Sequence, residues 1–449
     1  MTVLKIALCI LLVTLFACSE APKKAETGPE MTARQVISHI MNEEYEPIIA
    51  QFDSTMKANV RKVQLVEIYE SLNAQCGEFD KQGELKTFHE PPYDIVYVEM
   101  IFSDIPYWGK VILNPEGKIA GLRFMPSVPD ETTSPIADYI DPDKFTSRGG
   151  EFGVEEWRLP AVVTLPNGPG PFPAVILIHM HGAYDKDETV GANAPFKDIA
   201  GGLSSQGIAV MRFDKRSYVY KDVYDTLSDV TVQAEIIRDI HYAVDLLRQT
   251  TGIDSTQIYV LGHGFGGTLL PRVAEQTDHI AGYIALGAPV RPLPQVILDE
   301  VSHLYAEDGD ISADEKGAID KLTSEANMAA DSQLTPEIPR EYLPLSMPGS
   351  YWIDLRRYDP IEKALIMSEP LLVLQGERDY QATMADFDKW RELTMVRDNV
   401  DTRSFPNLNH LFIRGQGKSS PMEYMVPGHI DREVIDYIAN WIKKPKKTD

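Results

Sequence analysis

The stretch LGHGFGG, residues 261–267, carries the strongest structural signal in this sequence of 449 residues. An apolar run typical of a buried strand ends at its first residue, and residues 268–275 after it are typical of a helix. Gly262 and Gly266 stand two positions on either side of Gly264, where a sharp turn from strand to helix leaves room only for small residues. The stretch therefore predicts a tight strand-to-helix elbow.

The central position of this elbow, which normally presents a nucleophilic side chain, is Gly264. Glycine brings neither a hydroxyl nor a thiol. It also adopts positive φ freely, whereas serine in such a turn costs on the order of 1 to 3 kcal/mol. Thr268 lies one helical turn further on and Ser217 follows a different strand, so we expect neither to replace the nucleophile.

Strands and helices alternate on both sides of the elbow, from residue 145 onward, which is the pattern of an α/β fold. We expect a doubly wound, mostly parallel sheet in a domain of residues 140–445. Residues 289–350 are acidic, helix-prone and too long for an ordinary connection, so we interpret them as a cap insertion over the site. The predicted strands are 174–179, 209–213, 258–261, 283–286, 371–374 and 402–405, and the predicted helices include 195–206, 236–247 and 434–442.

Residues 31–127 are predicted to form a separate, small α+β domain, since 449 residues exceed what one core usually organises. Helical spacing at its start gives way to β-branched and aromatic runs at 93–102 and 110–113, and a turn signal precedes a last strand at 118–124. Cys76 in this domain is expected to be a small buried side chain. We find no residue set here that points to chemistry.

The first residues are typical of a targeting segment. Lys5 precedes the apolar run 6–16, which is too short to span a bilayer, so residues 1–17 are predicted to be a signal peptide that is removed. The motif Leu-Phe-Ala-Cys18 resembles the lipobox of bacterial lipoproteins, which implies that Cys18 is lipidated and that residues 18–30 are a flexible tether. We therefore expect a lipoprotein anchored outside the cytoplasm; the alternative is a plain secretory signal with a chance cysteine.

Composition and charge limit the classes of binding partner that we expect. With 43% hydrophobic and 24% charged residues, the chain has an ordinary globular composition. The net charge of -24 and the absence of a basic cluster in the sequence argue against nucleic acid. We expect a small-molecule partner, membrane contact through the N-terminal lipid anchor, and no cofactor.

Several runs resemble known families. FDSTMKANV, LNAQCGEF and GKIAGLRF resemble the small DUF3887-type domain that often precedes bacterial α/β-hydrolases. FKDIAGGLSSQGIAV, FDKRS, LQGERD and LNHLF resemble the hydrolase domain of those proteins, over residues 145–443. The resemblance implies an α/β-hydrolase fold with serine at the elbow, hydrolysis of acyl esters, thioesters or amides, Asp379 as the acid and His410 as the general base.

A second departure from the family pattern lies after the first central strand. Enzymes of this kind usually have His-Gly-Ser-Gly there, whereas this chain has His-Met-His-Gly at 179–182. One oxyanion donor is expected to be the backbone N–H of Phe265, directly after the elbow position. The second donor is expected near Met180 or His181.

Three interpretations stay open at this point. The first is a family member with lost or weakened catalysis that binds a small acyl substrate or ligand under its cap. The second keeps catalysis by His410 and Asp379, acting as a general-base dyad on water or on an acidic substrate proton. In the third, a zinc ion supplies the missing nucleophile, held by His179, His181, His263 and His410, which all follow predicted strands.

Overall fold

The structure, a computed structural model, describes residues 26–90, 93–125, 136–224, 226–306, 311 and 313–444. The chain divides into two compact units, Met1–Val128 and Pro129–Asp449. The predicted signal peptide and Cys18 lie outside the described residues. Within the described ranges, no helix combines the length and apolarity needed to cross a bilayer.

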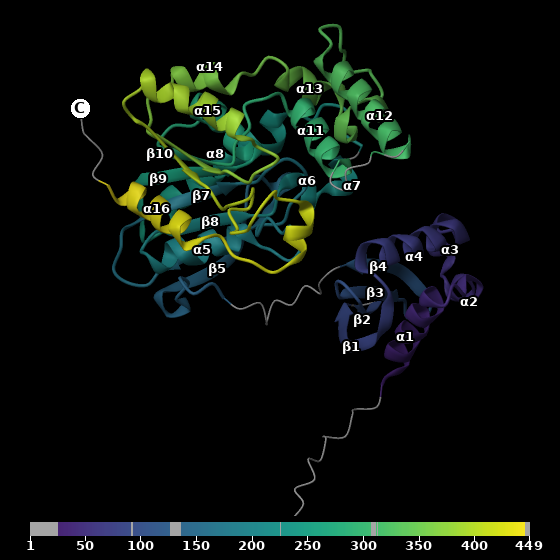
Figure 1. The fold of residues 1–449 in the computed structure, drawn as a ribbon. Helices are drawn as coiled ribbons and strands as arrows, with labels where there is room; N and C mark the ends of the chain where they lie inside the picture. The colour runs from purple at the N-terminus through teal and green to yellow at the C-terminus, as the bar shows by residue number, and fades with distance from the viewer. Residues whose placement is uncertain are drawn as a thin grey trace, which may run out of the picture. The chain divides into compact units, whose positions relative to one another are not determined.

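The first unit packs helices against one face of a four-stranded antiparallel sheet (Figure 1). Ile37 and Ile40 of the first helix share a core with Val96 and Val98 of the second strand. Cys76 is 1% exposed and free, as predicted. The elements are α1 (Gly28–Met41), α2 (Tyr45–Gln51), α3 (Ser54–Asn59), α4 (Lys62–Cys76), β1 (Phe79–Glu90), β2 (Tyr93–Phe102), β3 (Tyr107–Leu113) and β4 (Ile119–Met125).

Two features of this unit differ from expectation. Helix α1 begins at Gly28, inside the predicted tether, because Thr27 and Glu30 form a capping box and Pro29 suits a first helical turn. Strand β1 has no counterpart among the predicted strands. It is an edge strand with the mostly polar sequence FDKQGELKTFHE, so its residues lack the apolar alternation that marks a half-buried strand.

The second unit is built on an eight-stranded sheet of order β12-β11-β10-β9-β7-β8-β6-β5. The strands from β7 to β12 pair in parallel, and β5 and β6 join antiparallel next to β8. The sheet is therefore mostly parallel, as predicted. Its strands are β5 (Phe145–Phe152), β6 (Leu159–Pro166), β7 (Phe172–Ile178), β8 (Ala209–Phe213), β9 (Ile253–His263), β10 (Gly282–Leu286), β11 (Leu371–Gly376) and β12 (Val400–Phe405).

Helices cover both faces of this sheet, so the fold is doubly wound (Figure 1). Alternate residues of β7 enter different cores: Val175 and Leu177 pack with α5 and α16, while Ile176 and Ile178 pack with α8. A strand buried on both faces reads as a continuous apolar run, which is why the central strands are visible in the sequence. The main covering helices are α5 (Pro195–Ser205), α8 (Arg238–Gln249), α15 (Met384–Glu392) and α16 (Arg432–Lys443).

Local differences from expectation have local causes. Residues 145–166 form a β-hairpin whose strands are joined by one short 3-10 helix, Glu155–Trp157, in place of a covering α-helix. The helix after the elbow is split into α9 (Phe265–Thr268) and α10 (Leu270–Ala274), because Pro271 lacks an N–H and its ring crowds the preceding turn.

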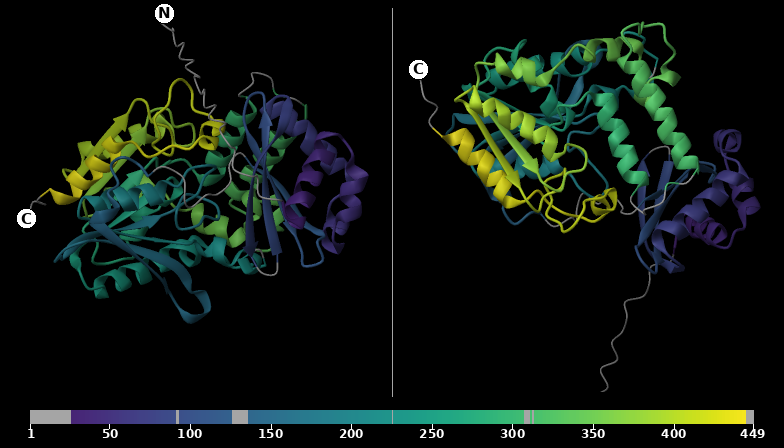
Figure 2. Two further views of the ribbon diagram at one scale, coloured as in Figure 1. Left: turned by 90° about the horizontal axis from the view of Figure 1, so that it is seen from below. Right: turned by 45° about the horizontal axis from the view of Figure 1, so that its top comes forward.

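The predicted cap insertion is helical. It contains α11 (Leu293–Tyr305) and α12 (Ala313–Ala330), which pack side by side (green in Figure 2), and it runs into α13 (Gly349–Leu355). Leu293, Val296 and Ile297 on α11 are buried. The cap is therefore attached to the domain through an apolar face of α11, together with Ala329 of α12 and with Leu334 and Leu343, which belong to the same core.

Candidate active site

The elbow has the geometry that the glycine spacing predicts. Strand β9 ends at His263, Gly264 has φ 51° and ψ -120°, and α9 begins at the next residue. A Cβ at Gly262 would lie 2.3 Å from backbone atoms of Gly266, and one at Gly266 would lie 2.5 Å from the carbonyl oxygen of Ile178. Only glycine fits at these two flanking positions.

The space in front of Gly264 contains the base and one bulky neighbour. A Cβ at this position would lie 3.3 Å from His410 Nε2 and 2.9 Å from the Cβ of Met180. The first distance places His410 beside the elbow, as the family resemblance implies. The second is shorter than real Cβ contacts allow, so a side chain at 264 requires Met180 to move.

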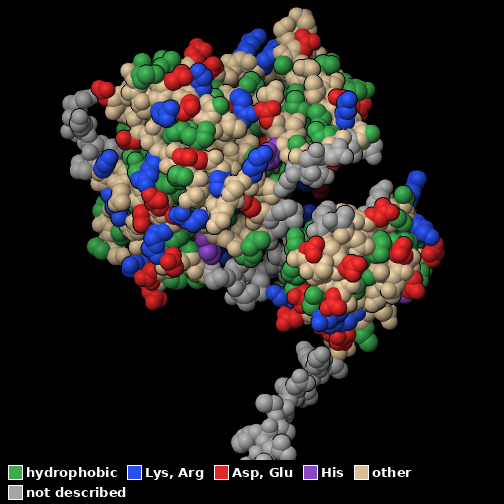
Figure 3. Space-filling view, in the orientation of Figure 1, with side chains coloured by type: hydrophobic (Ala, Val, Ile, Leu, Met, Phe, Trp, Pro, Cys, Tyr) green, Lys and Arg blue, Asp and Glu red, His purple; other side chains and the backbone are tan. Residues whose placement is uncertain are grey.

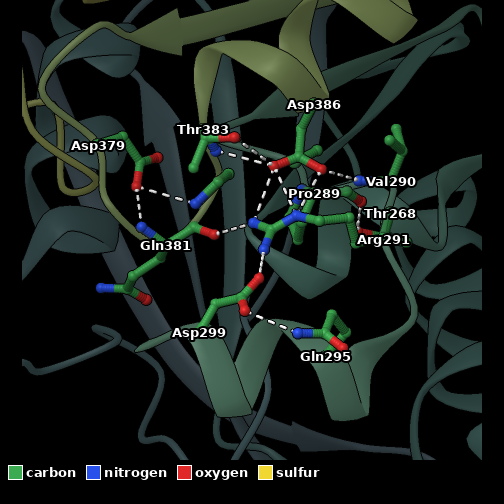
Figure 4. Close-up of polar contacts among 12 residues, drawn as sticks. Thr268, Pro289, Val290, Arg291, Gln295, Asp299, Asp379, Gln381, Thr383 and Asp386 are labelled. Atoms are coloured by element: carbon green, nitrogen blue, oxygen red, sulfur yellow. Dashed lines mark hydrogen bonds and ion pairs between the residues drawn. The ribbon is translucent and has the colours of Figure 1, made fainter. Parts of the chain in front are cut away.

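His410 and Asp379 form a buried pair. His410 Nδ1 donates to Asp379 Oδ2 over 2.7 Å, and the two side chains are 2% and 0% exposed. The other carboxylate oxygen accepts the backbone N–H groups of Gln381 and Ala382 (Figure 4). Because Nδ1 carries the proton, Nε2 is left as the acceptor that faces Gly264.

The oxyanion loop differs in part from expectation. The backbone N–H of Met180 donates to Glu188 Oε1 over 2.8 Å, so the prediction of Met180 as an oxyanion donor is wrong. Lys215 Nζ, from the FDKRS run, donates to the carbonyl oxygens of Met180 and Gly182. The N–H groups of His181 and Phe265 have no acceptor among the described residues, which makes these two the available donors.

Glu188 is a site residue that the sequence does not reveal. It is 0% exposed, has φ 52°, and its Oε2 accepts from His263 Nδ1 over 2.6 Å. Burial opposes a charge on His263, but the Glu188 carboxylate outweighs it and raises the pKa of His263. Glu188 lies in a polar loop 75 residues before its partner, so no periodicity or spacing marks it.

The cap adds a carboxyl group to the site. Glu300 of α11 lies 3.6 Å from His181 Nε2, and the two side chains are 16% and 19% exposed. Burial, with the nearby charge of Asp379, raises the pKa of Glu300 to about 8. Burial, with the charges of Lys215 and His410, lowers the pKa of His181 to about 4. Both groups are therefore neutral near pH 7.

Arg291, just before α11, connects the cap to the loop that carries the acid (Figure 4). Its guanidinium donates to both carboxylate oxygens of Asp386 over 2.9 to 3.2 Å, and to the carbonyl oxygen of Gln381 over 2.8 Å. It also pairs with Asp299 of α11. The Arg291 side chain therefore links α11 to Gln381 and to Asp386, the segment that follows Asp379.

The zinc hypothesis is not supported by the positions of the histidines. His179 Nε2 contacts the carbonyl oxygen of Asp185, and both ring nitrogens of His263 contact protein oxygens. Among the described residues, no group of three or more His, Cys, Asp or Glu side chains is placed to hold a metal ion. Thr268 Oγ1 donates to the carbonyl oxygen of Pro289 over 2.6 Å and also lies 3.4 Å from the carbonyl oxygen of Gly264, so backbone carbonyl groups hold its hydroxyl.

The centre of the site is closed. Met180 is 4% exposed, His410 2% and Phe265 3%. Cavities of about 450 and 420 Å³ lie beside α12 and beside Tyr139, and none of these three residues lines either.

Comparisons with known proteins find two similarities in sequence. Residues 33–122 match the family described as "Protein of unknown function (DUF3887)". Esterase EstD of Thermotoga maritima is 36% identical to this chain over 408 residues, which are 91% of this chain and 94% of the esterase.

Solved structures with a similar chain course include two esterases. Est1E from Butyrivibrio proteoclasticus is 15% identical with a TM-score of 0.41, covering 66% of this chain and 98% of Est1E. The esterase domain from a Rhodothermus marinus protein is 17% identical with a TM-score of 0.39, covering 66% of this chain and 97% of that domain. From its similarity to EstD and its DUF3887 match, this chain belongs to the family of bacterial α/β-hydrolase esterases that carry an N-terminal DUF3887-type domain.

Proposed function

We propose that this protein binds a small acyl compound at the esterase-type site and has lost most or all hydrolysis by the serine route. The observation that carries the proposal is the pair Gly264 and Met180. The elbow has no hydroxyl, and the Met180 Cβ lies 2.9 Å from the place of a Cβ at residue 264. The two residues are complementary in shape, which supports a settled loss of the nucleophile.

The contribution of a serine nucleophile to turnover shows how much activity its absence removes. Removing the nucleophile of a serine hydrolase lowers turnover by about 10⁶, and the oxyanion donors and substrate binding leave about 10³ to 10⁴ over water. A typical turnover of roughly 10 per second would fall to about one per day. Binding, through His410 Nε2 and the N–H groups of His181 and Phe265, is what these residues can still do.

The second candidate function is general-base catalysis by His410. The intact pair with Asp379, at 2.7 Å, favours it, because the imidazole is held with Nε2 as an acceptor for a water or substrate proton. It predicts slow turnover of p-nitrophenyl butyrate that His410→Ala removes. Unchanged turnover in His410→Ala would refute it.

We also propose that the protein acts outside the cytoplasm, held at a membrane by lipid on Cys18. The support is the pattern of Lys5, the apolar run 6–16 and the lipobox-like residues that end at Cys18. The esterase-type site of an anchored protein would then bind compounds that are present outside the cytoplasm.

A fluorophosphonate probe tests the loss of serine chemistry. We expect no labelling of the wild type, weak labelling of Gly264→Ser, and strong labelling with ester hydrolysis once Met180→Gly is added, because the second change removes the clashing Cβ. Gly264→Ser should also lower the free energy of unfolding by about 1 to 3 kcal/mol. Gly264→Ala is the matched control, since it adds the same strain without a hydroxyl.

Each result bears on the proposal. Stoichiometric labelling of the wild type would reveal another nucleophile and overturn it. If the double variant folds and stays unlabelled, His181→Ser is added, because this restores the usual loop residue. A folded triple variant that is still inert would show that His410 and Asp379 are not a catalytic pair.

A further inference from the structure

Two carboxylate–histidine pairs lie against each other in this site. His410 pairs with Asp379, and His263 pairs with Glu188. The two imidazole rings are stacked, with centroids 4.5 Å apart and an interplanar angle of 28°. His263 Nε2 also contacts the backbone carbonyl oxygen of His410 over 2.9 Å. The second pair therefore touches both the ring and the backbone of the base.

The hydrogen-bond partners fix the protons of the second pair. The carbonyl oxygen of His410 can only accept, so His263 Nε2 carries a hydrogen. The Glu188 carboxylate already accepts the Met180 N–H at Oε1, and its Oε2 lies 2.6 Å from His263 Nδ1. A proton is required in this contact as well. The Glu188 carboxylate raises the pKa of His263, which favours a proton on both nitrogens of the ring.

Glu188 is the point where three segments of the site meet. Its carboxylate holds the oxyanion loop through the N–H of Met180 and holds the end of β9 through His263, which in turn holds the loop of His410. Its φ of 52° is in the left-handed region, which a glutamate occupies at a cost of about 1 to 3 kcal/mol. Such strain persists where the surrounding contacts over-determine the backbone.

We propose that Glu188 and His263 are positioning residues, which together set the orientation of His410 and of the oxyanion loop. The inference deepens the proposed function, because His410 and the loop N–H groups are the groups assigned to the ligand. Removing Glu188 leaves the Met180 N–H without its acceptor and frees the loop to turn. His410 then loses its support at the carbonyl oxygen, although no atom of its own side chain has changed.

Nitrogen-15 NMR of labelled histidines in the full-length, ligand-free protein tests the proposal. In the wild type we expect His263 to be protonated on both ring nitrogens and His410 on Nδ1. Glu188→Gln should move the His410 ring resonances and leave His263 singly protonated near neutral pH. Asp198→Asn is the matched control, since Asp198 pairs with His429 in the same domain at 3.0 Å, and it should leave the His410 resonances in place.

Unchanged His410 resonances in folded Glu188→Gln would overturn the proposal. If that variant does not fold, Glu188→Asp keeps the charge with a shorter reach, and it must still move the His410 resonances for the proposal to stand. In the Gly264→Ser, Met180→Gly background, Glu188→Gln should lower kcat by about 10²-fold with little change in KM. If that background is inert, the proposed function is in question while the NMR result still decides the positioning role.

Discussion

At residue 264 the backbone adopts φ 51° and ψ -120°, a conformation that glycine tolerates and that strains other residues by about 1 to 3 kcal/mol. An esterase that keeps serine here accepts that strain because the hydroxyl is needed. In this chain the turn is relaxed, and Met180 takes up space next to it. The same two residues therefore stabilise the elbow and close it.

Glu300 is expected to make stability depend on pH. Its pKa of about 8 lies above its ordinary value of 4.5, so between these values the folded protein holds a proton that the unfolded chain has lost. The free energy of unfolding therefore falls as pH rises through this window, by up to about 1.4 kcal/mol per pH unit from this group. In Glu300→Gln we expect this component to be absent when urea unfolding is compared at about pH 5 and about pH 8.

Glu341→Gln is the control for this prediction, because Glu341 is an exposed glutamate in the same cap insertion. It should reproduce the pH dependence of the wild type. A Glu300→Gln variant with the wild-type pH dependence would mean that Glu300 is ionised in the folded protein at neutral pH.

At the scale of elements, the cap helix α11 and the loop after β11 behave as one assembly. Arg291 joins them through Asp299 and Asp386, and His303 of α11 stacks on Tyr380 of the loop with ring centroids 4.5 Å apart. Glu300, on the same helix, reaches His181. A movement of α11 would therefore also shift the loop that carries Asp379.

Arg291→Met is expected to lower the free energy of unfolding by about 3 to 5 kcal/mol, because it leaves the buried Asp386 carboxylate without its cationic partner. Asp386 is 1% exposed. Faster amide hydrogen exchange in residues 379–386 should accompany the loss, and urea unfolding gives its size.

Arg391→Met is the matched control. Arg391 pairs with Asp388 at the surface, with side chains 59% and 51% exposed, and such pairs contribute about 0 to 1 kcal/mol. Equal losses in the two variants would show that Arg291 has no special role in joining α11 to the loop.

At the scale of the whole molecule, the protein is strongly acidic. The sequence carries a net charge of -24, and on the face in view the basic side chains are interspersed with acidic ones (Figure 3). Such a charge favours solubility and weakens attraction to anionic lipid surfaces. A stable membrane location would therefore depend on a covalent anchor.

Metabolic labelling with a palmitate analogue tests the anchor. The wild type should be labelled and sediment with membranes, and Cys18→Ala should lose both properties, because the acylated sulfur is removed. Cys76→Ala is the control and should be labelled like the wild type, since Cys76 is buried. Equal labelling of Cys18→Ala and the wild type would refute the lipobox interpretation.

Local pattern was enough to predict the central architecture. The predicted strand at 209–213 coincides with β8, and the elbow glycines stand where neighbouring backbone atoms lie 2.3 to 2.5 Å from the place that a Cβ would take. A strand that is buried on both faces needs a continuous apolar run, and a close approach of two backbone segments needs glycine. Both patterns can be recognised from adjacent residues in the sequence. The polar edge strand β1 has no such pattern. At Pro271 the proline splits a helix that the pattern predicts to be continuous.

Periodicity is a short-range property, and it was sufficient to predict the mostly parallel sheet and the helical insertion. The glycine spacing predicted the elbow at Gly264, and the family resemblance implied Asp379 and His410. The folded structure was needed to show that the Met180 amide is taken by Glu188, and that His263 is stacked on His410. These contacts join segments up to 147 residues apart. A hydrogen bond between distant residues leaves no periodic trace, since its partner is chosen by the packing of the whole domain.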